Sequence, residues 1–336
     1  MSKPQEETDS TASTDQNRPA DGFWHKAWPW TSSAITLSVV IAAFWLLYHE
    51  FKTVRWQDVV ASFHSLPYSV VFVAILLTAV NYLIMIGYDW LGTRLVHHPV
   101  KLAQIATAST LSFAFGNSLG MFFGATPIRF RLYTGWGMSP REIVRLIFFV
   151  SLAFWIGLFS IAGLLFVISP FELPPRFDLP MGTSRPIGAI MLVLACGYFS
   201  ACAYRRHPIH FFGVNFQPPP LGIGVAQAMV AGFDFLFAAG TLYVLLPQEV
   251  TIGFLPFASI YLLAIILALV SNVPGGLGVL EIVLITMLPP TGHSLVASLL
   301  AYRIIYYLLP LLLAVVVLGT GSVRELMAKR WFQAGD

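Results

Sequence analysis

Residues 116–145 constrain the fold of this chain more than any other part of the sequence. They read GNSLGMFFGATPIRFRLYTGWGMSPREIVR and lie between two strongly apolar runs. The glycines, the proline and the arginines are unusual in a plain membrane span, and the apolar helix predicted at 105–123 is unusual in a soluble loop. We therefore predict that a helix enters the membrane and breaks at the four residues from Gly124 to Pro127. Broken backbone survives at membrane depth only where it is buried in protein or lines a water-filled cavity.

Composition defines the class of protein. Of the 336 residues, 57% are hydrophobic and 10% are charged, whereas about 25% of the residues of a soluble domain are charged. The length holds about eight spans of about 20 residues each. We therefore predict an all-α integral membrane protein with about eight transmembrane helices plus re-entrant or broken helices. The net charge of +3 is too small to indicate nucleic acid as a partner.

The order of segments predicts one membrane domain, residues 31–322, between two tails. Residues 1–30 are mostly polar, and we expect a disordered tail there. Residues 323–336 form a short basic tail. Asn81 and Asp89 lie inside the second of the apolar runs. Those runs are 34–48, 68–91, 142–168, 186–204, 221–246, 254–270 and 294–320.

Lysines and arginines in the loops predict the orientation, because cytoplasmic loops carry an excess of them. If the amino terminus is cytoplasmic and residues 101–139 enter and leave on the same side, 14 basic residues are cytoplasmic and 4 are outside. A fully spanning 101–123 would place Arg205 and Arg206 outside instead. We prefer the re-entrant arrangement, with both termini in the cytoplasm.

The two halves of the chain share one pattern. Each has at least two spans, then a segment interrupted by glycine and proline, then a strongly apolar helix. The first half begins near Ala34 and breaks at Pro127, and the second begins near Ile187 and breaks at Pro274. Paired interrupted segments are typical of transporters built from inverted repeats, whose site lies where the repeats meet. The alternative is chance similarity between two series of hydrophobic helices.

Three stretches together resemble a known family. They are residues 124–133 (GATPIRFRLY) with the following 135–143, residues 272–281 (NVPGGLGVLE) and residues 301–310 (AYRIIYYLLP). In this order they resemble the bacterial lysylphosphatidylglycerol synthase/flippase transmembrane domain, and the resemblance covers nearly all of residues 34–320. In full-length members this domain moves aminoacylated phosphatidylglycerol between leaflets, and a soluble aminoacyl-transferring domain follows it. The resemblance implies a stand-alone flippase-like form without the synthase domain, and it leaves the lipid open.

Arg129 and Arg131 are the candidates for binding a lipid phosphate. They lie two residues apart near the predicted break, and a guanidinium binds phosphate through two parallel hydrogen bonds. The alternative is that both anchor the chain at the cytoplasmic surface of the membrane, which is the role we favour for Arg141 and Arg145.

Asp234 lies near the middle of its predicted span, about 18–20 Å from either end. An unpaired carboxylate there costs on the order of 3 kcal/mol or more, so it must be protonated, paired or hydrated. It either binds an amine, a proton or a coupling ion, or it is the structural partner of one of the arginines.

Glu281 and Arg303 are predicted to form an intramembrane pair. The helix at 277–289 spans about 20 Å and cannot cross a core of about 30 Å, so the break before it lies inside the membrane. Counted from the turn that follows, Glu281 is about 12 Å and Arg303 about 14 Å below the same face. Opposite charges at equal depth should pair, because each alone is costly. The pair is either a fixed brace or a gate that opens for a zwitterionic or cationic head group.

The two predicted backbone breaks supply further candidates. They allow the backbone to approach a ligand closely, and the helix after the second break offers N–H groups to an anion. The alternative is a break that serves packing only. Asn117 and Thr126 are weaker candidates for the wall of a lipid path. The residues at the breaks are Gly124, Pro127, Pro274, Gly275 and Gly276.

These features predict a lipid translocator of the bacterial inner membrane that moves a phospholipid, such as phosphatidylglycerol or its aminoacylated form, between leaflets. No zinc-ligand spacing, nucleophile elbow or nucleotide-binding loop occurs in the sequence, so we predict no catalytic residue, metal or cofactor, and no enzyme activity. The alternatives are a scaffold or partner subunit for a separate lipid-modifying enzyme, and an intramembrane enzyme acting on a lipid head group. Besides membrane phospholipids, the expected partners are that separate enzyme and a second copy of the chain.

Overall fold

A computed structural model of the chain describes residues 66–172, 183–204, 209–211, 214–216, 218–271, 276, 278–288 and 293–320. The structural statements that follow concern these residues. Both predicted tails and the predicted span at 34–48 lie outside them.

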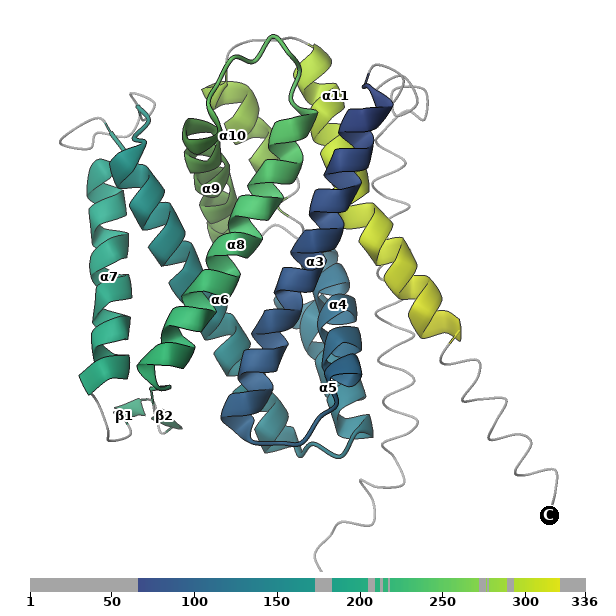
Figure 1. Cartoon of the computed structure of the whole chain (residues 1–336), viewed down its shortest axis with the longest axis vertical. Coiled ribbons are helices and arrows are strands. Elements are labelled where there is room, and N and C mark those ends of the chain that lie inside the picture. Colours follow the sequence, from purple (N-terminus) through teal and green to yellow (C-terminus); the bar gives the residue numbers. More distant parts are fainter. Residues whose placement is uncertain are drawn as a thin grey trace, which may run out of the picture.

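Nearly all of the described residues are helical, and one two-stranded β-hairpin is an addition to the all-α prediction (Figure 1). The elements in chain order are α3 (Tyr68–Val96), α4 (Leu102–Leu119), η1 (Met121–Ala125), α5 (Thr126–Gly135), α6 (Pro140–Ile168), α7 (Arg185–Tyr204), β1 (Ile209–Phe211), β2 (Val214–Phe216), α8 (Leu221–Leu245), α9 (Phe254–Ser271), α10 (Val279–Met287), α11 (His293–Tyr302) and η3 (Arg303–Leu308). The segments η1 and η3 are π-helical, and β1 and β2 pair antiparallel.

Six of the described helices are long and apolar enough to cross a membrane: α3, α6, α7, α8, α9 and Ser294–Thr320, which includes η3. Their bounds agree with the predicted apolar runs to within a few residues. Large apolar side chains such as Phe72, Val193 and Val316 are exposed on them, as expected of surfaces that contact lipid tails. The chain is therefore a multi-pass helical membrane protein.

The region from α4 to α5 folds as a re-entrant hairpin, as predicted. α4 begins at the end of the bundle where α3 ends, and α5 returns to that end, where α6 begins (Figure 1). The helix breaks at Gly120, whose φ of 84° suits glycine and is strained in other residues. The predicted position of the break is therefore wrong. Gly124 lies in η1, and Pro127 is the second residue of α5, which continues directly from η1.

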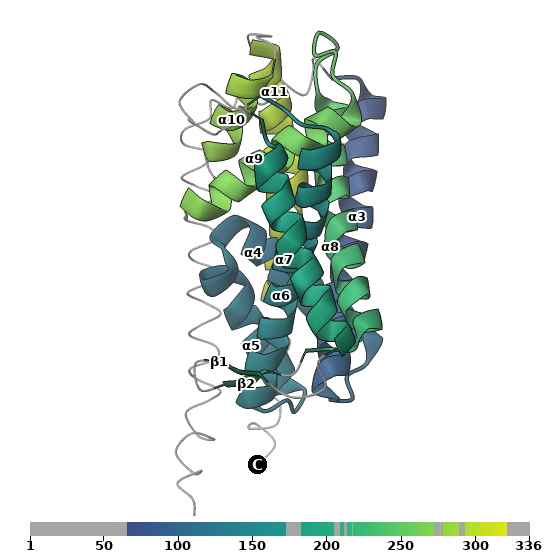
Figure 2. The ribbon, with the colours of Figure 1, turned by 90° about the vertical axis from the view of Figure 1, so that its left-hand side faces the viewer.

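An equivalent hairpin in the second half enters from the opposite end. α9 begins where α8 ends, and α10 returns to that end, where α11 begins. Figure 2 shows the α9/α10 pair in the upper part of the bundle and the α4/α5 pair in the lower part. The order helix, hairpin, helix thus occurs twice with opposite direction, as α3, α4/α5, α6 and as α8, α9/α10, α11. The first helices of the two units, α3 and α8, pack against each other.

The start of α6 fixes the end of the first hairpin. Ser139 accepts a hydrogen bond from the Glu142 N–H at 3.4 Å, and the Glu142 carboxylate accepts one from the Ser139 N–H at 2.7 Å. Such reciprocal capping satisfies N–H groups that the first turn leaves open. Glu142 also lies 3.4 Å from His98 in the loop before α4. The loop before α4 is therefore joined to the first turn of α6, which follows the hairpin.

Candidate functional site

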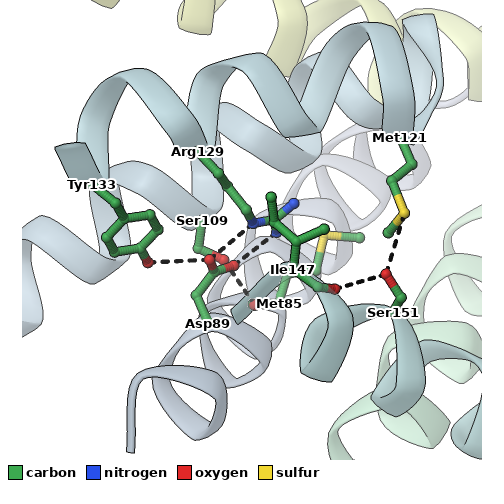
Figure 3. A network of polar contacts seen from close by, with 8 residues as sticks. All are labelled: Met85, Asp89, Ser109, Met121, Arg129, Tyr133, Ile147 and Ser151. Atoms are coloured by element: carbon green, nitrogen blue, oxygen red, sulfur yellow. Dashed lines mark hydrogen bonds and ion pairs between the residues drawn. The ribbon is translucent and has the colours of Figure 1, made fainter. Parts of the chain in front are cut away.

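A buried ion pair links the first hairpin to α3 (Figure 3). Arg129 on α5 donates from Nε to Asp89 Oδ1 at 3.0 Å and from Nη2 to Asp89 Oδ2 at 2.8 Å. Tyr133, one turn further along α5, donates to Asp89 Oδ1 at 3.1 Å. Arg129 is 1% exposed and Asp89 is 0% exposed. The carboxylate accepts three hydrogen bonds, and the two charges compensate each other where little water reaches them.

The surroundings make this pair costly to break. The guanidinium carbon of Arg129 lies 5.0 Å from the centroid of the Phe113 ring on α4. The Tyr133 hydroxyl supplies a further donor to the Asp89 carboxylate from the next turn of α5. Removing one member of such a pair leaves an uncompensated buried charge. The pair therefore ties α5 firmly to α3.

Two serines fasten the rest of the hairpin (Figure 3). Ser109 on α4 donates to the carbonyl of Met85 on α3 at 2.9 Å. Ser151 on α6 donates to the carbonyl of Ile147 at 2.7 Å and lies 3.4 Å from the sulfur of Met121 on η1. These contacts hold α4 against α3 and one side of η1 against α6, whereas Phe122 and Phe123 on η1 are exposed.

The structure does not bring Arg129 and Arg131 together. Residues two apart on a helix point about 200° apart around its axis. Arg129 faces α3 and is buried, whereas Arg131 is half-buried. This geometry does not support one phosphate held by both side chains. The burial of Arg129 is also unlike that of a surface anchor.

A second polar cluster lies where α3, α8 and η3 meet. Asp234 on α8 is 5% exposed and accepts from Asn81 Nδ2 at 2.9 Å and from the Tyr88 hydroxyl at 2.8 Å. The Asn81 amide also donates to the Tyr306 hydroxyl at 2.8 Å. The alternative that Asp234 pairs with an arginine is therefore wrong for the described residues, because both of its donors are neutral.

Tyrosines extend this cluster toward the second hairpin. The hydroxyls of Tyr261 on α9 and Tyr302 share a hydrogen bond of 2.8 Å. The rings of Tyr302 and Tyr306 stack with centroids 5.1 Å apart. The polar interior between the two halves is therefore built mainly from neutral donors and acceptors.

Some buried polar atoms in this interior have no hydrogen-bond partner. They include Asn81 Oδ1, the Tyr82 hydroxyl and Asn117 Nδ2. Unpaired buried polar groups are uncommon and typically mark functional or hydrated places. Asn117, predicted as a wall residue, lies beside Tyr82. Thr126, the other predicted wall residue, begins α5 and is half-buried.

The predicted contact between Glu281 and Arg303 is confirmed. Arg303 Nε donates to Glu281 Oε1, and Nη2 donates to Glu281 Oε2 at 2.9 Å. The Gly276 carbonyl lies 3.4 Å from Nη2, so the arginine also reaches the second break. The two side chains are 13% and 23% exposed, so this pair is more accessible than the pair on the first hairpin. Arg303 begins the π-helical η3, and such irregular helical turns are frequent at functional sites.

The glycines at the breaks allow close packing. A Cβ on Gly124 would lie 2.2 Å from the Phe115 carbonyl oxygen, so only glycine lets η1 approach α4. Gly276 has a φ of +61°, and a Cβ there would lie 2.9 Å from Ala268. Pro274 and Gly275 lie outside the described residues.

The roles of Asp89 and Tyr88 were not predicted from the sequence, although Asp89 and Asn81 lie inside a predicted apolar run. The signal was the charge itself, because an ionisable residue within a span needs a partner. Among the described residues, no group of three or more His, Cys, Asp or Glu side chains could hold a metal ion.

Comparisons with known proteins place the chain among membrane proteins. It is 33% identical over 316 residues to the uncharacterized protein slr0712 of Synechocystis, covering 93% of this chain and 98% of that protein. It is 28% identical over 311 residues to the inner membrane protein YbhN of Escherichia coli, covering 91% and 97%. It is 22% identical over 314 residues to the phosphatidylglycerol lysyltransferase of Staphylococcus aureus, covering 90% of this chain but 35% of that protein. No protein-family model matches the chain.

Proposed function

Because the chain belongs to the lysylphosphatidylglycerol synthase/flippase transmembrane-domain family, we propose that it moves a phospholipid between the leaflets of the bacterial inner membrane. The proposed substrates are phosphatidylglycerol and its aminoacylated form. The S. aureus relative is named for the first of these lipids. In this proposal both termini lie in the cytoplasm, so the α4/α5 hairpin enters from the cytoplasmic side and the α9/α10 hairpin from the outside.

The observation that carries this proposal is the pair of re-entrant hairpins from opposite ends, each held by a charged pair. A lipid head group needs polar partners to cross about 30 Å of hydrocarbon. Transporters built from inverted repeats place such partners where broken helices meet. The charged pairs Asp89–Arg129 and Glu281–Arg303 and the neutral cluster around Asp234 give this chain polar groups along its interior.

The Glu281–Arg303 pair is the one we assign to the head group. It is partly exposed, whereas the Asp89–Arg129 pair is not. A lipid phosphate can replace Glu281 on the Arg303 guanidinium through the same two parallel hydrogen bonds. Glu281 is then free to accept from the amine of an aminoacylated head group. In this mechanism Glu281–Arg303 is a gate and Asp89–Arg129 is the brace that holds the hairpin.

Reconstitution tests the proposal directly. The purified full chain is placed in liposomes with labelled phosphatidylglycerol or its lysyl form, and the label in each leaflet is measured over time. Wild type should move at least one of the two lipids faster than protein-free liposomes do. Equal rates with and without protein would refute translocation of these lipids.

Arginine variants then assign the roles within the same assay. Arg303→Gln should abolish translocation per folded molecule, with the folded yield of the variant measured alongside. Arg303→Lys should restore it only in part, because lysine lacks the planar two-bond contact. Arg131→Gln should retain translocation, because Arg131 points away from Arg129 and is not assigned to the head group. Arg94→Gln, an exposed arginine on α3, is the matched control. Transport by Arg303→Gln at the wild-type rate would contradict the gate.

A further inference from the structure

We propose that Asp234 is a proton-binding site between the two halves of the protein, and that the Asn81 amide stabilises both of its charge states by turning over. The inference stands on the geometry around the carboxyl group and does not depend on lipid translocation. It selects one of the ligands that a buried carboxylate could take, namely a proton.

Asp234 has no compensating positive charge among the described residues. Its hydrogen-bond donors are Asn81 and Tyr88, and no arginine, lysine or histidine of the described residues acts on it. The arginines on the hairpins, Arg129 and Arg303, each bind a carboxylate of their own. Within the part of the chain that the structure describes, the titratable groups that face Asp234 are all phenols: Tyr82 and Tyr88 on α3, Tyr261 on α9, and Tyr306 and Tyr307 on η3. Burial among neutral groups disfavours the charged form of a carboxylate, and a bound proton removes that charge.

The arrangement of donors and acceptors around Asn81 fits both charge states of Asp234. When Asp234 is ionised, Asn81 Nδ2 donates to Asp234 Oδ1 and to the Tyr306 hydroxyl. When Asp234 carries a proton, the amide can turn by 180°. Its oxygen then accepts from the Asp234 O–H and from the Tyr306 O–H across the same two contacts of 2.9 Å and 2.8 Å. Tyr88 donates to Asp234 Oδ2 in both states. The proton is therefore accommodated without moving any other heavy atom.

These two states are balanced in their hydrogen bonds. With Asp234 ionised, Asn81 Oδ1 is buried without a partner. With the amide turned, the NH₂ group takes that position and is equally without an acceptor. Neither orientation gains an additional hydrogen bond from the surroundings, so the charge of Asp234 decides which one is adopted.

Asp234 and Asn81 lie at the contact between the two inverted units, so a proton bound there affects that contact. Asn81 is the thirteenth residue after the start of α3 at Tyr68, and Asp234 is the thirteenth after the start of α8 at Leu221. The two residues thus occupy equivalent positions in the first helices of the two inverted units. A proton on Asp234 changes the contact between the halves at its centre. A metal cation fits less well, because donors already occupy both carboxylate oxygens.

Infrared difference spectroscopy tests the inference on the purified full chain. Spectra recorded on acidification show the carbonyl stretch of each carboxylic acid that gains a proton. Wild type should show a band that Asp234→Asn lacks. Tyr88→Phe should keep the band and move it to higher frequency, because the acid carbonyl loses a hydrogen bond. Tyr68→Phe is the matched control on the same helix, since Tyr68 is exposed at the start of α3, and it should leave the band in place.

The outcomes are decisive even if Asp234→Asn does not fold. Identical spectra from wild type and a folded Asp234→Asn would overturn the proposal. Equal band positions in Tyr88→Phe and Tyr68→Phe would do so as well, without using the Asp234 variant. Disappearance of the band when sodium replaces a larger cation at constant ionic strength would identify a metal-cation site and would also overturn it.

Discussion

The Asp89–Arg129 pair yields a quantitative prediction for the stability of the first hairpin. Arg129→Gln removes the guanidinium from a carboxylate that is 0% exposed and receives two hydrogen bonds from it. Loss of one partner of a buried pair costs about 3–5 kcal/mol, because the remaining charge stays buried without compensation. We expect a decrease of that size in the free energy of unfolding. Asp89→Asn should cause a similar decrease by leaving Arg129 uncompensated.

Equilibrium unfolding of the purified protein in mixed detergents measures these losses. The double variant Asp89→Asn/Arg129→Gln carries no buried charge at this site, so its loss should be smaller than the sum of the single losses by at least about 2 kcal/mol. Arg94→Gln is the control, because Arg94 is exposed and its guanidinium carbon lies 4.0 Å from the Trp90 ring centroid. This control substitution should lower the free energy of unfolding by less than about 1 kcal/mol. The reasoning is refuted if Arg129→Gln costs no more than Arg94→Gln, or if the single losses simply add.

Three further predictions follow from the hairpins and the orientation. Gly124→Ala should sharply reduce folded yield, because its Cβ would lie 2.2 Å from a backbone oxygen of α4, whereas Gly135→Ala, with no atom within 4 Å of the new Cβ, should fold normally. Glu281→Gln or Arg303→Gln should reduce folded yield more than the double variant does; strictly additive losses would show that the two side chains do not interact. In a chain without its native cysteines, an impermeant thiol reagent on intact cells should label a cysteine at Gln248 but not one at Gly135; the reverse pattern would place the termini outside.

The helices of this protein could be predicted well from hydropathy because the membrane imposes one length on them. The predicted run 221–246 is α8 (Leu221–Leu245), and the predicted run 294–320 is the helical segment Ser294–Thr320. The re-entrant path of the first hairpin could also be predicted, since it follows from loop charges rather than from packing. The β-hairpin at 209–216 was not predicted, although Ile209–Phe211 and Val214–Phe216 each alternate apolar and polar residues, because strands of three residues give too short a pattern.

The exact break in the first hairpin could not be predicted because three glycines at intervals of four, Gly116, Gly120 and Gly124, look equivalent in sequence. The proline after them favoured the last one. In the structure only Gly120 has a positive φ, while Gly116 and Gly124 are required by contact with neighbouring backbone and Ala125. The difference between a glycine that turns the chain and a glycine that lets two helices approach depends on tertiary packing.

Both ion pairs, the predicted Glu281–Arg303 and the unpredicted Asp89–Arg129, join residues at equal depth along their helices. For Glu281 and Arg303, equal depth below a short turn was sufficient. The same count applies to the first hairpin: Asp89 is seven residues, about 10 Å, from the end of α3, and Arg129 is six residues, about 9 Å, from the end of α5. Both helices end at the same face because the hairpin is re-entrant, so the two charges lie at one depth. Arg131 is four residues from that end and faces another direction, so helical phase then selects Arg129. Charged pairs within such a membrane domain therefore become predictable once loop charges have established which segments return to the side they entered.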